Sequence, residues 1–422
     1  MNYEQLLKEK YEIPASVLKL AEEAEAELAD KFFEISKTVS FNQTKVLSAF
    51  REARVSEQHL GITTGYGYDD VGRDTLDEIY ADVFGAESAL VRHSIVSGTH
   101  ALALCLFGVL RPGDVMVSVT GKPYDTLEEV IGIRGTGNGS LRDWGVDYRE
   151  VALLPDGTPD FEAIKQAITP EVKLVEIQRS KGYDWRKSLL IEDIRAICDC
   201  VHSVRSDVIC MVDNCYGEFA EEQEPCEVGA DLVVGSLIKN PGGGLAQTGA
   251  YIAGKKDLIE QVSYRLTSPG IGAEVGATLG MNRSMYQGFF MAPHVVGEAI
   301  KTAVFAAKML EKLGYPVCPT SDEARGDIIQ AVKLGDSEKL CAFCQGIQAG
   351  SPVDAYVTPM PWDMPGYENQ VIMAAGTFVS GASIEISADG PIREPYIAYM
   401  QGGLTYESGK LAVMCAVSRI LK

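Results

Sequence analysis

A lysine stands at the end of an apolar run, where its amine could act as a nucleophile. The run Leu232–Val234 leads into Ser236-Leu237-Ile238-Lys239, which is followed by Asn240-Pro241 and the glycines at 242–244. A lysine at the end of a buried strand is poorly solvated, so we expect burial to lower the pKa of Lys239 and free its amine to attack an aldehyde. The glycines would let the backbone approach a cofactor closely. A lysine that merely extends into solvent fits this glycine-rich context less well.

Two other segments offer a carboxylate and an anion-binding site. Asp213 ends the apolar run Val208–Val212, where an acid could hold a heterocyclic nitrogen protonated or could simply cap a helix or turn. Ser97-Gly98-Thr99 opens the apolar stretch Ala101–Leu110, so free backbone N–H groups and two hydroxyls could cradle a phosphate, although an ordinary helix cap has the same appearance. An amine, a carboxylate and an anion site are together the groups that pyridoxal 5'-phosphate (PLP) requires.

These segments lie within an alternation of predicted strands and helices. Short β-branched runs predict strands at 115–119, 172–177, 208–212, 232–234 and 249–253. Apolar periodicity predicts helices at 97–110 and 191–201. This alternation is typical of an α/β protein with a mostly parallel sheet covered on both faces, in which ligands bind at the carboxyl ends of the strands.

The segments before and after this alternation have different residue patterns. Apolar residues at helical spacing predict one arm helix over residues 14–37, and Thr75-x-x-Glu78 resembles a capping box that opens a helix through Phe84. From about residue 300 an Ala-rich helix is followed by segments punctuated by proline and glycine, and by a final helix from Ser408. We therefore expect three parts, namely an N-terminal arm and helix (1–60), a large cofactor-binding domain (61–300) and a smaller C-terminal α+β domain (301–422).

The motifs resemble those of the fold type I PLP-dependent enzymes of the Cys/Met metabolism family. The closest likeness is to the branch described as methionine gamma-lyase-like or aluminium-resistance proteins, which is similar to the cystathionine lyases. The resemblance covers roughly residues 60–260 and extends more weakly to the C-terminus. It implies that Lys239 forms the Schiff base, that Asp213 holds the ring nitrogen, that Tyr124 stacks on the ring, and that the phosphate is bound by Ser97, Gly98, Thr99 and Ser236.

The resemblance also implies that subunits share active sites and that an arginine binds the substrate carboxylate. At some positions the sequence departs from the family's motifs. Family members place a Tyr-x-Arg before the first helix, which reaches the phosphate of a neighbouring subunit. Here Tyr66 and Tyr68 are expected to take that role within a homodimer or homotetramer with shared active sites, whereas Arg73 is displaced from the motif. His100 replaces the family's usual apolar residue. For the substrate carboxylate we choose Arg393, in an expected rigid turn over 389–395 of the small domain, over Arg325 and Arg419.

The activity that the resemblance implies is carbon–sulfur bond cleavage in a small amino acid. Lys239 would remove the Cα proton, Tyr124 would protonate the leaving thiolate, and the products would be a 2-oxo acid, ammonia and a thiol. Elimination at Cβ and at Cγ are both open. So are transamination or γ-replacement on the same fold, and a PLP-binding role in stress tolerance with little turnover.

Composition excludes several other classes. The net charge of −21 in 422 residues disfavours nucleic acid and anionic membranes as partners, and the longest apolar runs are too short to span a bilayer. The N-terminus lacks the pattern of a secretory signal, so we expect a cytoplasmic protein with reduced thiols. Cys341 and Cys344 form a lone CxxC, which predicts no metal site. Ser236-x-x-Lys239 without a Lys-Thr-Gly partner is not the motif of penicillin-binding enzymes.

Overall fold

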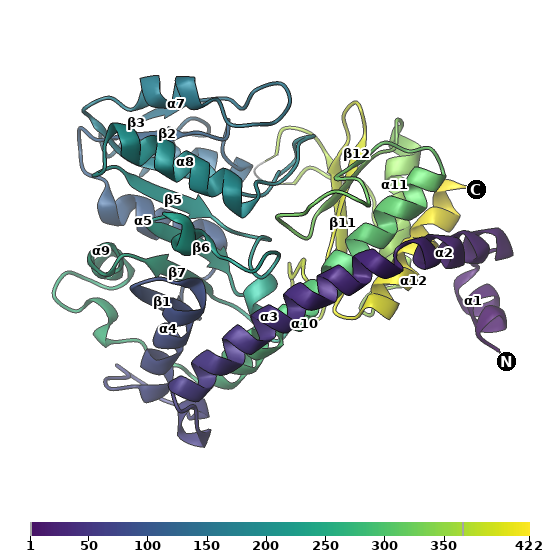
Figure 1. The fold of residues 1–422 in the computed structure, drawn as a ribbon, viewed down its shortest axis with the longest axis horizontal. Coiled ribbons are helices and arrows are strands. Elements are labelled where there is room, and N and C mark those ends of the chain that lie inside the picture. The colour runs from purple at the N-terminus through teal and green to yellow at the C-terminus, as the bar shows by residue number, and fades with distance from the viewer. Residues whose placement is uncertain (1, 365–366) are drawn as a thin grey trace.

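The computed structural model describes residues 2–364 and 367–422, which form two sheets surrounded by helices (Figure 1). The helices are α1 (Tyr3–Tyr11), α2 (Ala15–Glu27), α3 (Ala29–Glu52), α4 (Val71–Phe84), α5 (Gly98–Val109), α6 (Asp125–Ile131), α7 (Phe161–Ala167), α8 (Ile191–Val204), α9 (Lys256–Leu266), α10 (Asn282–Lys312), α11 (Ser337–Ala349) and α12 (Tyr406–Ile420). The strands are β1 (Ser88–Arg92), β2 (Val115–Ser118), β3 (Asp147–Glu150), β4 (Val172–Gln178), β5 (Ile209–Asp213), β6 (Leu232–Ser236), β7 (Ala250–Gly254), β8 (Val317–Cys318), β9 (Gln330–Lys333), β10 (Val371–Ala374), β11 (Ser387–Pro391) and β12 (Ile397–Gln401).

The larger sheet is mostly parallel, as the sequence predicts. Its seven strands run in the order β1-β7-β6-β5-β4-β2-β3, and only β7 is antiparallel to its neighbours. The five predicted strands coincide with β2, β4, β5, β6 and β7. Because β4, β5 and β6 are parallel, their carboxyl ends meet at one edge of the sheet, which is where a ligand is expected.

Alternate residues of these strands pack on opposite faces, as the pleat requires. In β5, Ile209 and Met211 join the apolar core beneath α5 and α9, whereas Cys210 and Val212 join the core beneath α8. Both faces are therefore covered by helices, which explains why the strands are continuous apolar runs rather than alternating ones.

The N-terminal helices pack on α10 of their own chain. Figure 1 shows α3 lying along α10 between the two sheets. The prediction of one helix over residues 14–37 is wrong in its extent, because α2 ends at Glu27, Leu28 interrupts the helix, and α3 continues to Glu52. The buried face runs on through Leu28, so the apolar pattern gave no sign of the break.

Helix α4 begins one turn earlier than predicted. The side chain of Asp70 accepts a hydrogen bond from the backbone N–H of Arg73 at 2.9 Å and so caps the helix. Thr75 and Glu78 consequently lie inside α4, and the capping-box interpretation is wrong. Asp70 is the preferred cap because its carboxylate accepts a hydrogen bond from a free N–H group of the first turn. The positive end of the helix also stabilises its negative charge.

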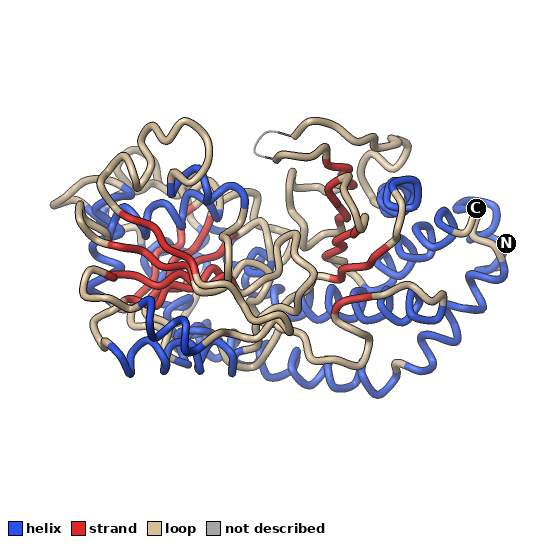
Figure 2. Tube along the Cα trace, turned by 90° about the horizontal axis from the view of Figure 1, so that it is seen from above, coloured by secondary structure: helices blue, strands red, loops and turns tan. Residues whose placement is uncertain are grey.

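The smaller sheet is antiparallel, with strand order β10-β11-β12-β9-β8, and α11 packs against it and against α12. Figure 2 shows its strands as a group separate from the larger sheet, which matches the expected fold class of a parallel domain with a smaller C-terminal one. Residue 300, where we placed the domain boundary, lies inside α10, which is 31 residues long and continues through Pro293 without a break. No helix in the described ranges has both the length and the apolarity needed to cross a membrane.

Candidate active site

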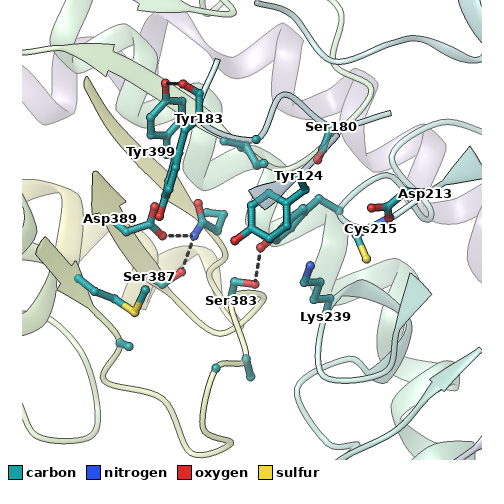
Figure 3. Close-up of a pocket in the computed structure, with 18 of the residues that line it drawn as sticks. Tyr124, Ser180, Tyr183, Asp213, Cys215, Lys239, Ser383, Ser387, Asp389 and Tyr399 are labelled. Atoms are coloured by element: carbon teal, nitrogen blue, oxygen red, sulfur yellow. Dashed lines mark hydrogen bonds between the residues drawn. The ribbon is translucent and has the colours of Figure 1, made fainter. Parts of the chain in front are cut away.

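A cavity of about 200 Å³ lies between the two sheets (Figure 3). One wall comes from the carboxyl ends of the larger sheet and the loops that follow, including Asp213 and Lys239. The other wall comes from the smaller sheet and includes Asp389 and Gln401. The cavity is thus at the position that parallel α/β sheets generally use for ligands, closed by a second domain.

Lys239 reaches the cavity from a turn that follows β6. The backbone N–H of Leu237 bonds to the carbonyl of Gly249, which keeps the chain beside β7 before it turns. A Cβ on Gly242 would lie 1.7 Å from the carbonyl oxygen of Leu237, and one on Gly243 would lie 2.4 Å from the carbonyl oxygen of Gly288 in α10. The glycines therefore let the turn fold back and pack on α10, which is a different reason from the close approach to a cofactor that the sequence suggested.

The amine of Lys239 makes no ion pair or hydrogen bond within the described part of the chain. Its Nζ lies 4.0 Å from the centre of the Tyr216 ring. Burial lowers the pKa of Lys239, but the acidic groups of Cys215, Tyr216, Asp213 and Glu218 outweigh it and raise this pKa above its usual value. The prediction that burial lowers the pKa of Lys239 is therefore wrong for the cofactor-free chain. The sequence does not show how close the fold brings these acidic groups to the amine.

Asp213 is the last residue of β5 and lies opposite Gln178 of β4. One carboxylate oxygen, Oδ1, accepts a hydrogen bond from the backbone N–H of Cys215 at 3.1 Å. Asp213 and Lys239 line the same cavity and lie on one side of it in Figure 3. An acid that ends one strand and an amine that follows another thereby line one cavity.

The start of α5 forms an anion cradle next to these groups. Ser97 caps the helix, because its hydroxyl oxygen accepts a hydrogen bond from the backbone N–H of His100 at 3.1 Å. The hydroxyls of Thr99 and Thr126 share a hydrogen bond at 2.8 Å. A Cβ added to Gly98 would lie 3.3 Å from Sγ of Cys215 and 3.7 Å from Cβ of Ser236. Gly98 thus packs against Cys215 and lies beside Ser236, which is buried and whose hydroxyl bonds no other side chain among the described residues. Free helix N–H groups and this hydroxyl fit a phosphate.

Tyr124 precedes α6 and projects into the cavity beside Gly182. Its hydroxyl shares a hydrogen bond with the hydroxyl of Tyr367, with the oxygens 2.5 Å apart. Burial, together with Tyr367 and Tyr216, raises the pKa of Tyr124 well above its usual value. The residue therefore holds its proton in the neutral pH range, as a proton donor must.

The structure does not bring Tyr66 and Tyr68 into this cavity. Their side chains are 72% and 60% exposed, and their rings lie 5.6 Å apart on the surface. Arg73 is only 3% exposed, and its guanidinium donates to the carbonyl oxygens of Gly67 at 2.6 Å and Gly276 at 3.2 Å. Arg73 thus fastens the loop that presents the two tyrosines and is not itself free to reach a second subunit.

Arg393 also lies outside the cavity that contains Lys239. It is exposed and lines a neighbouring cavity of about 180 Å³, which shares Tyr124, Tyr183 and Tyr367 as a dividing wall. Residues Asp389–Pro391 belong to the buried strand β11, so the interpretation of 389–395 as one rigid turn is wrong. The sequence Asp-Gly-Pro looks like a turn, but pairing with β10 and β12 holds it extended.

Several lining residues were not singled out from the sequence. Tyr216 faces Lys239 and directly follows the Asp213 segment, so its position in the chain was a usable signal. Asp389 and Gln401 come from the smaller sheet, and Ser383 comes from the turn before β11. Nothing in their local sequence separates them from ordinary polar residues, because only the packing of the two sheets gives them a cavity to face.

One group of possible metal ligands occurs within the described ranges, consisting of His202, Cys210 and Asp231. It lies away from the Lys239 cavity. Asp231 already uses both oxygens, since Oδ1 pairs with Lys255 at 2.6 Å and Oδ2 accepts from the backbone of Cys210 at 2.7 Å. These contacts give the acid a structural role at the amino-terminal side of the sheet.

Comparison with known proteins identifies the family. The family model for methionine gamma-lyase matches residues 17–421. The chain belongs to the methionine gamma-lyase family. Family members are PLP-dependent, and the amine, the carboxylate and the anion cradle described above fit that cofactor.

Relatives of the chain within the methionine gamma-lyase family are close in sequence and structure. The chain is 56% identical over 405 residues to YnbB of Bacillus subtilis, described as uncharacterized, covering 96% of each. A carbon–sulfur lyase involved in aluminum resistance from Clostridium novyi NT is 54% identical, with a TM-score of 0.96 over 100% of both chains. A methionine gamma lyase from Micromonospora echinospora, CalE6, shares the fold at 19% identity, with a TM-score of 0.56 over 87% of this chain and 93% of its own.

Proposed function

We propose that this chain is a PLP-dependent carbon–sulfur lyase that cleaves a sulfur-containing amino acid to a 2-oxo acid, ammonia and a thiol. The observation that carries the proposal is the convergence of an unpaired lysine amine and a strand-end carboxylate on one cavity, with an anion cradle beside them that contacts Cys215 of the cavity wall. Membership of the methionine gamma-lyase family supports the reaction type.

In this proposal different residues bind different parts of the cofactor. The N–H groups at the start of α5, with Ser97, Thr99 and Ser236, would hold the phosphate, and Gly98 leaves room for it. Lys239 would bind the aldehyde carbon covalently and Asp213 the ring nitrogen. When bound, PLP supplies an electron sink that stabilises the negative charge left on Cα after loss of its proton.

The side chains then move protons at defined atoms. With PLP bound, Nζ of Lys239 would take the Cα proton, and the acidic groups around it favour the charged ammonium that results. Asp213 would keep the ring nitrogen protonated. Tyr124 donates its proton to the leaving sulfur, and its contact with Tyr367 orients the hydroxyl.

A substrate panel tests the proposal directly. Purified protein loaded with PLP should release thiol together with pyruvate from cysteine-type substrates, or with 2-oxobutyrate from methionine-type substrates. Assays run with and without an added 2-oxo acid as amino-group acceptor separate elimination from transamination. Cofactor retention with no thiol released from any sulfur amino acid would overturn the lyase assignment and favour a role in stress tolerance.

We also propose that a second copy of the chain completes the site. Tyr66 and Tyr68 are exposed on a loop that Arg73 fastens to the body, so they are held outward in a fixed position. A two-fold interface would place this loop near the partner's anion cradle and the partner's loop near this one. The arrangement would be a homodimer or a homotetramer built from such dimers.

A further inference from the structure

A buried carboxylate faces the cavity from the side opposite the cofactor-binding groups. Asp389 is 9% exposed and lies in the middle of β11, where the register pairs it with Tyr399 and pairs Ser387 with Gln401. Its Oδ2 accepts a hydrogen bond from Nε2 of Gln401 at 3.2 Å, and Tyr183 lines the same cavity. No lysine or arginine in the described part of the chain forms an ion pair with it.

The charges that line the cavity do not balance within the chain. Its described lining holds two carboxylates, Asp213 and Asp389, and a single cation, Lys239. In the proposed function Asp213 is paired with the ring nitrogen and Lys239 is bonded to the cofactor. Asp389 is then a buried carboxylate without a cation, an arrangement that is costly unless a ligand supplies the positive charge.

Asp389 nevertheless carries a negative charge at neutral pH. Burial raises the pKa of Asp389 to about 6, and the hydrogen bonds from Tyr183 and Gln401 limit the rise. The ionisable groups that face it are Tyr124, Tyr183, Tyr367, Tyr399 and, from α11 beneath the sheet, Cys344. Burial raises the pKa of each of these above its usual value, so they stay neutral while Asp389 titrates.

The place of Asp389 in the cavity determines which part of a substrate it would contact. In Figure 3, Lys239 and Tyr124 lie between Asp213 at one side and Asp389 at the other. The ring nitrogen belongs beside Asp213, and the reacting carbon belongs beside Lys239. A substrate side chain that extends from that carbon toward the smaller sheet would therefore face Asp389.

We propose that Asp389, with Gln401 and Tyr183, binds an ammonium group at the distal end of the substrate. This inference rests on the proposed carbon–sulfur lyase function and narrows its substrate class. The substrate is an S-substituted amino acid whose sulfur substituent bears a positively charged amino group. Methionine and cysteine lack that charge and would leave the buried carboxylate unpaired, so they are the poorer substrates.

Two isosteric substrates test the specificity. The PLP-loaded protein is assayed with S-(2-aminoethyl)-L-cysteine and with S-propyl-L-cysteine, which differ in an ammonium against a methyl group. We expect kcat/KM to favour the charged compound by at least about tenfold. Asp389→Asn should remove that preference. Asp184→Asn, which removes an exposed acid outside the cavity, should keep the preference.

The wild-type protein provides a second test that does not depend on a variant folding. The preference for the charged substrate should decline as the pH falls through about 6, because Asp389 takes up a proton and loses its charge below its pKa. The ratio of the two kcat/KM values cancels titrations that affect both substrates equally. A preference that stays constant from pH 8 to pH 5 would contradict the role of Asp389.

Binding without cleavage separates this inference from the lyase assignment. L-Lysine and L-2-aminoheptanoic acid match the two substrates in length but contain no sulfur, and their binding to the PLP-loaded protein can be followed by calorimetry. Tighter binding of lysine, lost in Asp389→Asn, would support the ammonium site even if no sulfur compound is cleaved. Equal binding of L-lysine and L-2-aminoheptanoic acid, or equal cleavage of the two cysteine derivatives, would overturn it and leave the lyase function standing.

Discussion

Replacing Asp213 with asparagine should nearly abolish turnover while leaving the fold and the cofactor in place. Asparagine retains the Oδ1 that accepts the backbone N–H of Cys215 at 3.1 Å, so the end of β5 keeps its local structure. What is lost is the negative charge facing the ring nitrogen. Breaking a largely buried ion pair costs about 3–5 kcal/mol. At about 1.4 kcal/mol per tenfold, kcat should fall roughly 150- to 5,000-fold.

The assay compares thiol release by wild type, Asp213→Asn and a control, Asp207→Asn, which makes the same change at an exposed acid paired with Arg205. The visible absorbance of the bound cofactor after gel filtration shows whether PLP is retained. Turnover by Asp213→Asn within about threefold of wild type, with PLP bound, would refute the assignment, since a shift of that size is under 1 kcal/mol.

Three further predictions concern other parts of the site. Tyr124→Phe should slow cleavage of S-alkyl substrates by roughly 100-fold or more and affect S-aryl substrates much less, because aryl thiolates leave without a proton; equal losses for both would argue against a proton donor. Gly98→Ala should weaken PLP binding roughly 5- to 150-fold, since overpacking costs about 1–3 kcal/mol, with little change in the denaturation midpoint of the cofactor-free chain; unchanged PLP affinity, measured by fluorescence titration, would remove Gly98 from the cradle. Mixed dimers of Lys239→Ala with Tyr66→Phe/Tyr68→Phe chains should regain activity at one of their two sites, and no recovery in hybrids verified by native mass spectrometry would contradict a shared site.

The sequence predicts the larger sheet and the cofactor end of the site well, for a physical reason. Strands covered on both faces are continuous apolar runs, so the polar residue that ends each run marks the ligand edge. Asp213 and Lys239 were identified in this way, and the structure places both at one cavity. The cap at Ser97 was equally visible, because serine before an apolar helix is a local signal.

The substrate end could not be predicted because its geometry is non-local. Asp389 faces the cavity because β11 pairs with β12 and the smaller sheet packs against the larger one. The local sequence Asp389-Gly390-Pro391 instead suggests a turn, which led to Arg393 as the substrate anchor. The effect of acids on the pKa of Lys239 was missed for the same reason, because Glu218 and Tyr216 approach it through the fold.

The central claim is that PLP is bound covalently at Lys239, and one measurement tests it most directly. The PLP-loaded protein is reduced with borohydride, digested, and mapped by mass spectrometry. Our account predicts a single reduced adduct on the peptide that contains Lys239, and no adduct in Lys239→Ala, whose denaturation midpoint serves as a folding control. An adduct on another lysine, or an adduct that persists in Lys239→Ala, would contradict it.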